Sequence, residues 1–295
     1  MSSKKKKILV LGCTGMLGHA VSEYFSKQPG YYVVHTYRES GKPNIALAHV
    51  IDDVAKNDDG REQNSFLKFN IDTQDPYFLE QLPSDFDYVI NCIGCVKQKD
   101  YDLRTYLSVN TQFPKMLATW CDHNSTKLIH ITTDCVFSGL NLDEGYSEND
   151  RPDCEDIYGI SKELGEPWNC LTLRTSIIGR EVRANYSLME WAISQKGKVV
   201  DGYVNHIWNG VTNFQYAKIC DTIIKDNLWQ HGLFHVFSTP VSKFEMLNSF
   251  NEKFDLGLTV NPYVHDLSIN RRLTTIHDFN SKLNIPSYHD MIKEI

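Results

Sequence analysis

Near its start the chain reads Ile8-Leu-Val-Leu11 followed at once by Gly12-Cys-Thr-Gly-Met-Leu-Gly18, and a helical pattern then continues to Ser26. Glycines at three-residue spacing let a backbone turn tightly and come close to a pyrophosphate. The N-terminus of the following helix adds amide donors and the positive end of its dipole. A turn that uses glycine only for steric reasons is the alternative, but the strand before it and the helix after it favour dinucleotide binding. The residues expected to touch the cofactor here are Gly12, Thr14, Gly15, Met16, Leu17 and Gly18.

Short β-branched runs alternate with helical patterns through the first 175 residues. Strands are predicted over residues 7–11, 31–36, 67–71, 88–91, 127–131 and 171–174, and helices over 15–26, 77–82, 104–123 and from Tyr158 onward. Residues 39–64, with an acidic stretch at 52–59, have the polar composition of a loop. Because parallel strands need helical crossovers, this order predicts an α/β fold, a Rossmann-type doubly wound parallel sheet with helices on both faces.

Beyond residue 176 the alternation loses its regularity, and no linker rich in proline or glycine separates the two parts of the chain. A second domain would therefore be woven into the first. We expect residues 1–175 to form an NADP-binding domain and residues 176–295 to form mainly a smaller substrate-binding region interwoven with it.

Composition excludes several classes of protein. The chain has 295 residues, of which 41% are hydrophobic, and a formal net charge of −7, so no basic excess favours binding to a nucleic acid polymer. No apolar run approaches the roughly 18 residues that a membrane span needs, and the start MSSKKKK has no secretory h-region. Of eight cysteines only Cys92 and Cys95 have CxxC spacing, so we expect free thiols and no metal site. These features predict a soluble, cytoplasmic protein.

Residues that follow the second, third and fourth strands indicate which dinucleotide binds. An NAD site would place Asp or Glu at the end of the second strand, whereas this chain has Tyr37-Arg38. A guanidinium there can bind a 2′-phosphate, so NADPH is the expected cofactor, with a solvated loop arginine as the alternative. The other residues expected at the cofactor are Asp72, at the adenine amino group, and Asn91, Cys92 and Gly94, at the end of the fourth strand.

A candidate reacting centre follows in Tyr158-Gly-Ile-Ser-Lys162, which places a phenol and an ammonium on one face of a helix. A free phenol has a pKa of about 10, and a nearby cation is expected to lower that pKa. The pair can then deliver a proton to a carbonyl oxygen as hydride reaches the carbon. A hydroxyl of Thr132-Thr133, at the end of the fifth strand, can hydrogen-bond the same oxygen, although threonine is also common in strands for its β propensity.

This order of motifs resembles the extended short-chain dehydrogenase/reductase superfamily. More narrowly, the dTDP-4-dehydrorhamnose reductase branch is similar at three segments, Thr132-Thr-Asp-Cys-Val-Phe-Ser-Gly139, Tyr158-Gly-Ile-Ser-Lys-Glu-Leu-Gly-Glu166 and Leu173-Arg-Thr-Ser-Ile-Ile-Gly179. The resemblance implies reduction of the 4-keto group of a nucleotide-linked 6-deoxyhexose with NADPH. By the family pattern Thr133, Tyr158 and Lys162 carry catalysis, and Lys162 also binds the nicotinamide ribose beside Tyr158.

The same resemblance implies where the nucleotide-sugar substrate binds. Thr133, Asp134 and Cys135 would meet the sugar at the end of the fifth strand. In the C-terminal region Asn270-Arg-Arg-Leu273 resembles the late arginine-containing segment of the family, so Arg271 or Arg272 is expected at the substrate diphosphate. Two solvated arginines are the alternative.

Cys135 departs from this branch, whose reductases usually carry tyrosine there. A cysteine is instead similar to GDP-fucose synthase and to the plant rhamnose epimerase/reductases. In those bifunctional enzymes the thiol exchanges a proton beside the ketone before reduction, which is sensible chemistry for a thiol. Two interpretations follow, a 3-epimerase function or a small buried hydrophobe. Glu181 is near the expected place of the second epimerisation residue.

Several functions stay open at this point. The cysteine also resembles reductases for UDP-linked 2-acetamido-2,6-dideoxyhexoses, and we favour that substrate over dTDP-4-dehydrorhamnose. A non-catalytic NADP-binding regulatory subunit is a second hypothesis, since a methionine adenosyltransferase regulatory subunit shares the fold of this branch. A 4-epimerase or dehydratase that binds NAD tightly is a third. The presence of hydroxyl, phenol and ammonium together favours an enzyme. A homodimer is a further expectation.

Overall fold

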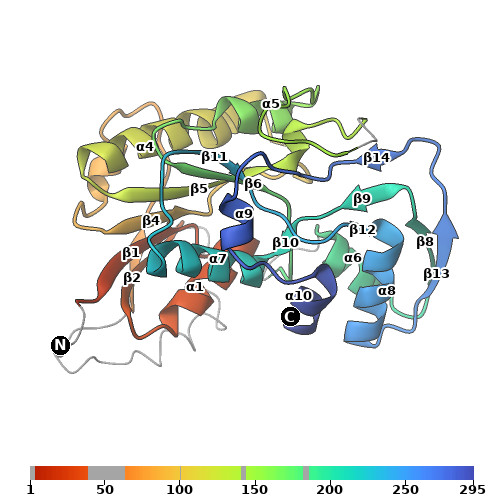
Figure 1. The fold of residues 1–295 in the computed structure, drawn as a ribbon. Helices are drawn as coiled ribbons and strands as arrows, with labels where there is room; N and C mark the ends of the chain where they lie inside the picture. Colours follow the sequence, from red (N-terminus) through yellow and green to blue (C-terminus); the bar gives the residue numbers. More distant parts are fainter. Residues whose placement is uncertain (1–3, 39–63, 100, 141–143, 182–185) are drawn as a thin grey trace.

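The computed structural model describes residues 4–38, 64–99, 101–140, 144–181 and 186–295. Its centre is a seven-stranded sheet in the order β11-β6-β5-β4-β1-β2-β3, in which every neighbouring pair is parallel (Figure 1). Helices cover both faces of the sheet, with α1 and α7 on one side and α4 and α5 on the other. The predicted doubly wound α/β fold is therefore confirmed.

The central sheet and its covering helices come mostly from the first two thirds of the chain. Its strands are β1 (Lys6–Leu11), β2 (Tyr31–Tyr37), β3 (Asn64–Lys68), β4 (Tyr88–Asn91), β5 (Lys127–Thr133), β6 (Leu171–Thr175) and β11 (Gly232–His235). The helical elements are α1 (Met16–Ser26), η2 (Phe78–Gln81), α3 (Leu103–Tyr106), η3 (Leu107–Gln112), α4 (Phe113–His123), η4 (Asp134–Val136), α5 (Ile157–Leu164) and α7 (Asn213–Lys225).

Strand β1 shows why its residues form a fully buried strand. Ile8 and Val10 belong to the hydrophobic core on the side of α1, whereas Leu9 and Leu11 belong to the core on the side of α4. None of the four side chains is exposed to solvent. Because side chains alternate across a strand, a continuous apolar run can only be buried if helices cover both faces of the sheet.

Two predicted elements differ from the structure. The third strand was expected over residues 67–71 but spans Asn64–Lys68, and Phe69, directly after it, stacks its ring on Phe78 of η2. The helix expected over 104–123 is interrupted by the π-helical η3, since Pro114 has no N–H to donate to the Asn110 carbonyl four residues earlier. Most of the predicted loop, residues 39–63, lies outside the described residues.

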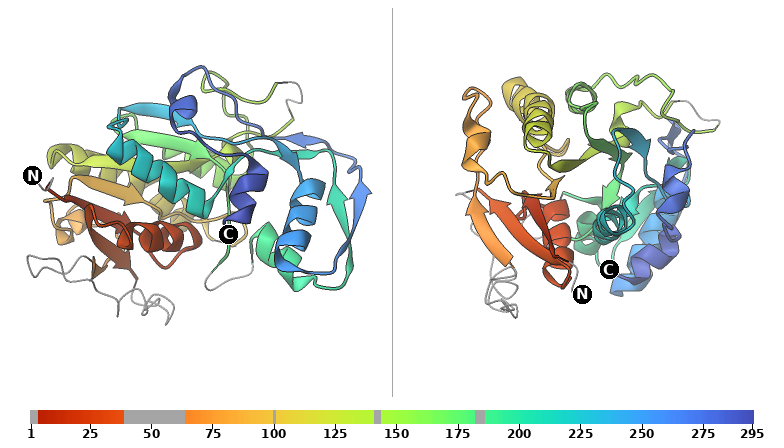
Figure 2. Two further views of the ribbon diagram at one scale, coloured as in Figure 1. Left: turned by 60° about the horizontal axis from the view of Figure 1, so that its bottom comes forward. Right: turned by 60° about the vertical axis from the view of Figure 1, so that its left-hand side comes forward.

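The chain beyond β6 builds a smaller lobe at the carboxyl end of the central strands (Figure 2). In this lobe β9 lies between β12 and β14, and β13 pairs with β8 in parallel. Two of its neighbours in sequence, α7 and β11, instead return to the central sheet. The other elements of this part are β7 (Ile177–Ile178), α6 (Leu188–Ser194), β8 (Val199–Tyr203), β9 (His206–Trp208), β10 (Val211–Thr212), β12 (Val241–Ser242), α8 (Lys243–Phe254), β13 (Thr259–Tyr263), β14 (Ile269–Asn270), α9 (Phe279–Lys282) and α10 (Tyr288–Lys293).

A buried carboxylate on α7 ties the returning helix to the first βα unit. Asp221 accepts hydrogen bonds from the hydroxyls of Tyr24, at 2.7 Å, and Tyr31, at 2.5 Å, and its side chain also pairs with Lys225. Asp221 and Tyr31 are each only 3% exposed. Since unpaired buried hydroxyls are costly, this junction stabilises the contact between the two parts of the chain.

We expect Asp221→Ala to lower the free energy of unfolding by about 2–4 kcal/mol, because the buried phenol of Tyr31 and the partly buried phenol of Tyr24 lose their acceptor. Tyr24→Phe removes only one of these hydrogen bonds and should cost about 1 kcal/mol. Urea denaturation followed by tryptophan fluorescence measures both. A smaller loss for Asp221→Ala than for Tyr24→Phe would contradict this account of the junction.

Candidate active site

The glycine loop after β1 can only be built with glycine at two of its positions. Gly12 has a φ of +85°, and a Cβ there would lie 2.8 Å from Cγ1 of Ile93. A Cβ on Gly18 would lie 2.1 Å from the carbonyl oxygen of Gly12. The loop is held at the sheet by the Gly12 N–H, which donates to Oγ1 of Thr36 at 3.0 Å. Helix α1 therefore starts in contact with the end of β1.

The N-terminus of α1 is free to bind an anion. Its N-cap is Gly15, no side chain caps its first N–H groups, and its first turn carries no acidic residue. Thr14, Met16 and Leu17 are partly exposed beside it, and Gly15 is exposed. The open amides and the positive end of the helix dipole suit the pyrophosphate of a dinucleotide.

The residues expected around the adenosine half lie at neighbouring strand ends. Arg38 directly follows β2 and is exposed, and its charge acts on Cys95 and Tyr101 of the segment after β4. Asp72 is exposed after β3, where one carboxylate oxygen accepts the N–H of Gln74 at 3.1 Å. Both side chains are accessible to a ligand lying across this edge of the sheet.

The end of β4 is closed by internal hydrogen bonds. Asn91 is fully buried, and its side chain contacts Nδ1 of His130 and accepts the N–H of Ile93 at 3.0 Å. Burial raises the pKa of Cys92, so its thiol is protonated. The missing side chain of Gly94 leaves space beside Lys162, whose Nζ would lie 3.8 Å from a Cβ at this position. Asn91 thus shapes the edge of the site, and Gly94 keeps it open.

The structure brings the three expected catalytic residues together at the carboxyl end of β5. Thr133 ends β5, is buried, and accepts the N–H of Cys135 on its Oγ1 at 3.1 Å. Tyr158, in the first turn of α5, lies close enough to Thr133 for the Thr133 hydroxyl to act on the pKa of its phenol. One turn later on α5 Lys162 donates from Nζ to the carbonyl oxygen of Ile131 at 3.0 Å.

The protonation state of this group differs from the expectation. Burial, and after it the neighbouring Cys135, raises the pKa of Tyr158, so the expected lowering by Lys162 is wrong for this structure. Burial lowers the pKa of Lys162 to about 8. The phenol is therefore protonated at neutral pH, which is the form that a proton donor to a carbonyl oxygen requires.

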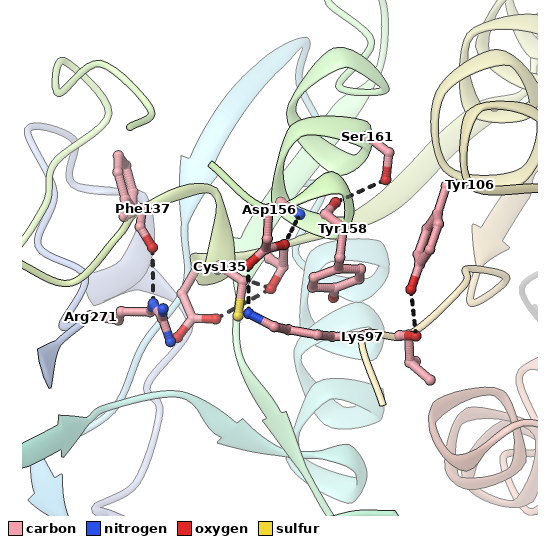
Figure 3. A network of polar contacts seen from close by, with 12 residues as sticks. Lys97, Tyr106, Cys135, Phe137, Asp156, Tyr158, Ser161 and Arg271 are labelled. Carbon is pink, nitrogen blue, oxygen red and sulfur yellow. Dashed lines mark hydrogen bonds and ion pairs between the residues drawn. The ribbon is translucent and has the colours of Figure 1, made fainter. Parts of the chain in front are cut away.

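The expected substrate residues lie on the other side of Thr133. Figure 3 shows Cys135 between Tyr158 and Arg271, whose Nε donates to the carbonyl oxygen of Phe137 at 2.9 Å. The buried Asp134 accepts a hydrogen bond from Thr133 at 3.2 Å and faces Arg271. Arg272 instead donates to Oδ1 of Asn270 at 2.9 Å. Of the two candidate arginines, Arg271 is the one placed at this centre.

The thiol of Cys135 is protonated in this environment. Burial, and then the charge of Asp134, raises the pKa of Cys135 to about 12, while Arg271 acts in the opposite direction. Glu181 accepts the N–H of Ser187 ahead of α6 and is not among the groups that act on the Cys135 thiol. Within the described residues, Glu181 therefore serves as a hydrogen-bond acceptor just before the start of α6.

Sequence reasoning missed three residues that shape the site. Asn110, buried in η3, bonds both backbone groups of Cys95, at 2.8 and 3.2 Å, and Oγ of Ser161. Asp156 caps α5 by accepting the N–H of Gly159 at 2.9 Å, and it also pairs with Lys97. The sequence did contain a signal for each of these two residues. Asn110 is a polar residue inside an otherwise apolar helical pattern, and Asp156 is an N-cap residue type three positions before Gly159.

Lys243 is the third of these, and its pKa responds to the charges of Asp134, Cys135 and Arg271. Nothing in the local sequence separates it from an ordinary exposed lysine. All eight thiols are free, and within the ranges that the structure describes no group of three or more His, Cys, Asp or Glu side chains could hold a metal ion.

Comparison with known proteins identifies the family to which the chain belongs. The model of the family described as RmlD substrate binding domain matches residues 6–256. The chain belongs to this family. Among solved structures, dTDP-4-dehydrorhamnose reductase from Bacillus anthracis in complex with NADP is similar at a TM-score of 0.70 and 18% identity, covering 98% of each chain. The UDP-glucuronic acid 4-epimerase from Bacillus cereus in complex with NAD gives 0.69 and 17%, over 97% of this chain and 96% of that one. At these identities the likeness concerns the fold.

Relatives by sequence match over part of the family region. The probable low-salt glycan biosynthesis reductase Agl14 of Haloferax volcanii is 31% identical over 163 residues, which are 53% of this chain and 46% of that protein. The dTDP-4-dehydrorhamnose reductase of Mycolicibacterium smegmatis is 34% identical over 98 residues, 32% of this chain and 30% of that one. The chain thus spans half or less of the length of these curated relatives. No helix of the described residues is long and apolar enough to cross a membrane.

Proposed function

We propose that the protein is an NADPH-dependent reductase acting on the 4-keto group of a nucleotide-linked 4-keto-6-deoxyhexose in deoxysugar biosynthesis. The observation that carries the proposal is the placement of Thr133, Tyr158 and Lys162 around one point at the carboxyl end of β5. This point lies at the same sheet edge as the open N-terminus of α1, where ligands of doubly wound sheets bind. Membership of the family supports the substrate class.

Each residue has a distinct task in such a reduction. Bound NADPH supplies the hydride. Thr133 can orient the ketone by hydrogen bonding to its oxygen, and the protonated phenol of Tyr158 transfers its proton to that oxygen, leaving an alcohol and a phenolate. The ammonium of Lys162, one turn away, then favours the phenolate and its reprotonation. The raised pKa of Tyr158 keeps the phenol protonated before the ketone is reduced.

Arg38 supports NADPH over NADH as the cofactor. The exposed guanidinium follows β2, where a carboxylate for the ribose hydroxyl of NAD would otherwise stand. The glycine cradle fits a dinucleotide because a Cβ at Gly12 would collide with Ile93 and a Cβ at Gly18 with the carbonyl of Gly12. Structural neighbours include an NADP complex and an NAD complex, so the choice depends on residues of this chain.

Two nucleotide sugars are candidates for the substrate. The name of the mycobacterial relative supports dTDP-4-dehydrorhamnose. Cys135, at the sugar side of the site, instead supports a UDP-linked 2-acetamido-2,6-dideoxyhexose. A panel of dTDP- and UDP-linked 4-keto-6-deoxyhexoses with NADPH oxidation as the readout tests both. Oxidation with neither class would refute the proposed function and leave a non-catalytic NADP-binding subunit as the better hypothesis.

The remaining expectations stand as parts of this proposal. Residues 1–175 bind the cofactor and residues 176–295 mainly bind the substrate. We further propose a homodimer in the cytoplasm, which light scattering and cell fractionation test directly. A second activity, 3-epimerisation through Cys135, is favoured by the position of its thiol beside Tyr158.

Tyr158→Phe should reduce turnover by about 10²- to 10⁴-fold, because only the proton donor is removed, and it should leave NADPH affinity within about twofold. Stopped-flow NADPH oxidation and fluorescence titration measure the two effects. Tyr77→Phe, at an exposed tyrosine beside η2, is the matched control. Retention of more than half the wild-type rate by Tyr158→Phe would rule out the assigned role.

Arg38→Ala should weaken NADPH binding by about 10- to 100-fold, the equivalent of one charge-assisted hydrogen bond, and leave NADH binding unchanged. Fluorescence titrations with both cofactors provide the comparison. Arg104→Ala, at an exposed arginine of α3, is the control. Equal losses for the two cofactors would contradict a contact with the 2′-phosphate.

Cys135→Ser should slow deuterium entry at C3 of the 4-keto sugar in D₂O without NADPH by at least about tenfold, since a hydroxyl is a much weaker acid than a thiol. Because the Cys135 pKa is raised to about 12, wild-type exchange should rise with pH across the neutral range as more thiolate forms. Cys154→Ser is the control, because Cys154 is not among the groups that act on the Cys135 thiol. Equal exchange by both proteins, or none by wild type, would falsify the epimerase role, whereas reduction should continue in either case.

A further inference from the structure

The first turn of α5, which carries Tyr158, is held on one side by the chain around η4. Just before the helix, the N–H of Cys154 donates to the carbonyl oxygen of Val136 at 3.1 Å. A Cβ on Gly159 would lie 2.4 Å from the carbonyl oxygen of Cys135, so the helix approaches η4 as closely as glycine allows. None of these contacts involves the segment after β4.

That segment, residues 94–99, is itself firmly anchored. Asn110 bonds both backbone groups of Cys95, at 2.8 and 3.2 Å. The Tyr106 hydroxyl donates at 3.1 Å to the carbonyl oxygen two residues after Lys97. Lys97 therefore extends from a piece of backbone that is fixed before and after it.

The side chain of Lys97 connects this segment to the start of α5 (Figure 3). Its Nζ lies 2.5 Å from Oδ2 of Asp156, the N-cap residue of the helix. The other carboxylate oxygen, Oδ1, accepts the N–H of Gly159 at 2.9 Å. Tyr158 lies between Asp156 and Gly159 in the sequence, so a displacement of the carboxylate also displaces the backbone that carries the phenol.

The exposure of this ion pair indicates a role other than stability. The side chains of Lys97 and Asp156 are 51% and 33% exposed, and ion pairs that are this exposed add little to the free energy of unfolding. The cap on α5 uses the other carboxylate oxygen and does not require Lys97. Proton transfer, by contrast, depends steeply on the position of the donor, so a weak contact can still affect its rate.

We propose that Lys97 is a positioning residue, whose ion pair with Asp156 fixes the phenol of Tyr158 against the hydroxyl of Thr133. The effect on catalysis rests on the reductase function proposed above, whereas the effect on the position of the phenol does not. Lys97 acts through Asp156 and takes no part in the proton transfer itself. Its loss should therefore change the rate of reduction and not the binding of either substrate.

NMR spectroscopy of the full chain with ring-¹³C tyrosine tests the position of the phenol without any turnover. The Tyr158 signal is assigned by its loss in Tyr158→Phe. Lys97→Met and Asp156→Asn should each shift this signal by more than its line width, although Asn still caps the helix. Lys97→Arg should restore the wild-type signal. Lys218→Met is the matched control, because it breaks a similarly exposed ion pair with Glu294 on another part of the surface.

The double variant Lys97→Met/Asp156→Asn separates a change of position from a direct effect of charge. Loss of one shared ion pair should give the same shift in both single variants and no larger shift in the double variant. Direct effects of the two lost charges on the phenol would have opposite signs and would cancel in the double variant. Shifts of opposite sign, or no shift in either single variant, would overturn the inference.

Kinetics with a 4-keto sugar and NADPH provide the second readout. Lys97→Met should lower kcat by about two- to fivefold, since an exposed ion pair cannot restrict the phenol by more than its own free energy. The KM values of sugar and NADPH should not change, and Lys97→Arg should restore kcat. A changed KM with an unchanged kcat would contradict the positioning role. Absence of reduction by wild type would refute the proposed function alone, and the Tyr158 signal would still decide this inference.

Discussion

The contact between Gly18 and the carbonyl of Gly12 is the constraint on which the rest of the site depends. A single methyl group at Gly18 would lie 2.1 Å from that oxygen, so only glycine lets α1 begin against the end of β1. This approach aims the uncapped amides of α1 at the edge between β1 and β4, where the strand order reverses. Doubly wound sheets bind ligands at this switch point. The position of Lys162 beside Gly94 extends the same edge to the reacting centre.

The site is assembled from two parts of the chain that contribute different chemistry. The central sheet contributes the hydroxyl of Thr133, the phenol of Tyr158 and the ammonium of Lys162. The smaller lobe supplies charge, through Arg271 after β14 and Lys243 at the start of α8. The returning elements α7 and β11 hold the two parts together, because Asp221 bonds tyrosines of α1 and β2. A ligand that contacts both parts would therefore lie between the phenol of Tyr158 and the cations of the smaller lobe.

Burial sets the protonation states of this centre. It raises the pKa values of Tyr158, Cys135 and Asp134, which favours their neutral forms. Neutral donors are suited to giving a proton to a developing alkoxide, whereas abstraction of a carbon-bound proton needs a thiolate at Cys135. The geometry therefore supports reduction more directly than epimerisation.

The sequence alone determined the parallel α/β fold, because apolar runs such as Ile8–Leu11 can be buried only between two helical layers. It also predicts a site with Thr133, Tyr158 and Lys162, through the four-residue spacing of Tyr158 and Lys162 on α5 and the family resemblance at the end of β5. Tertiary structure decided what local patterns cannot encode: the bounds of β3, and the placement of Arg271 rather than Arg272 at the reacting centre. The direction of the Tyr158 pKa shift belongs to the same class. These features depend on burial and on contacts between residues far apart in sequence. None of them leaves a periodic signal along the chain.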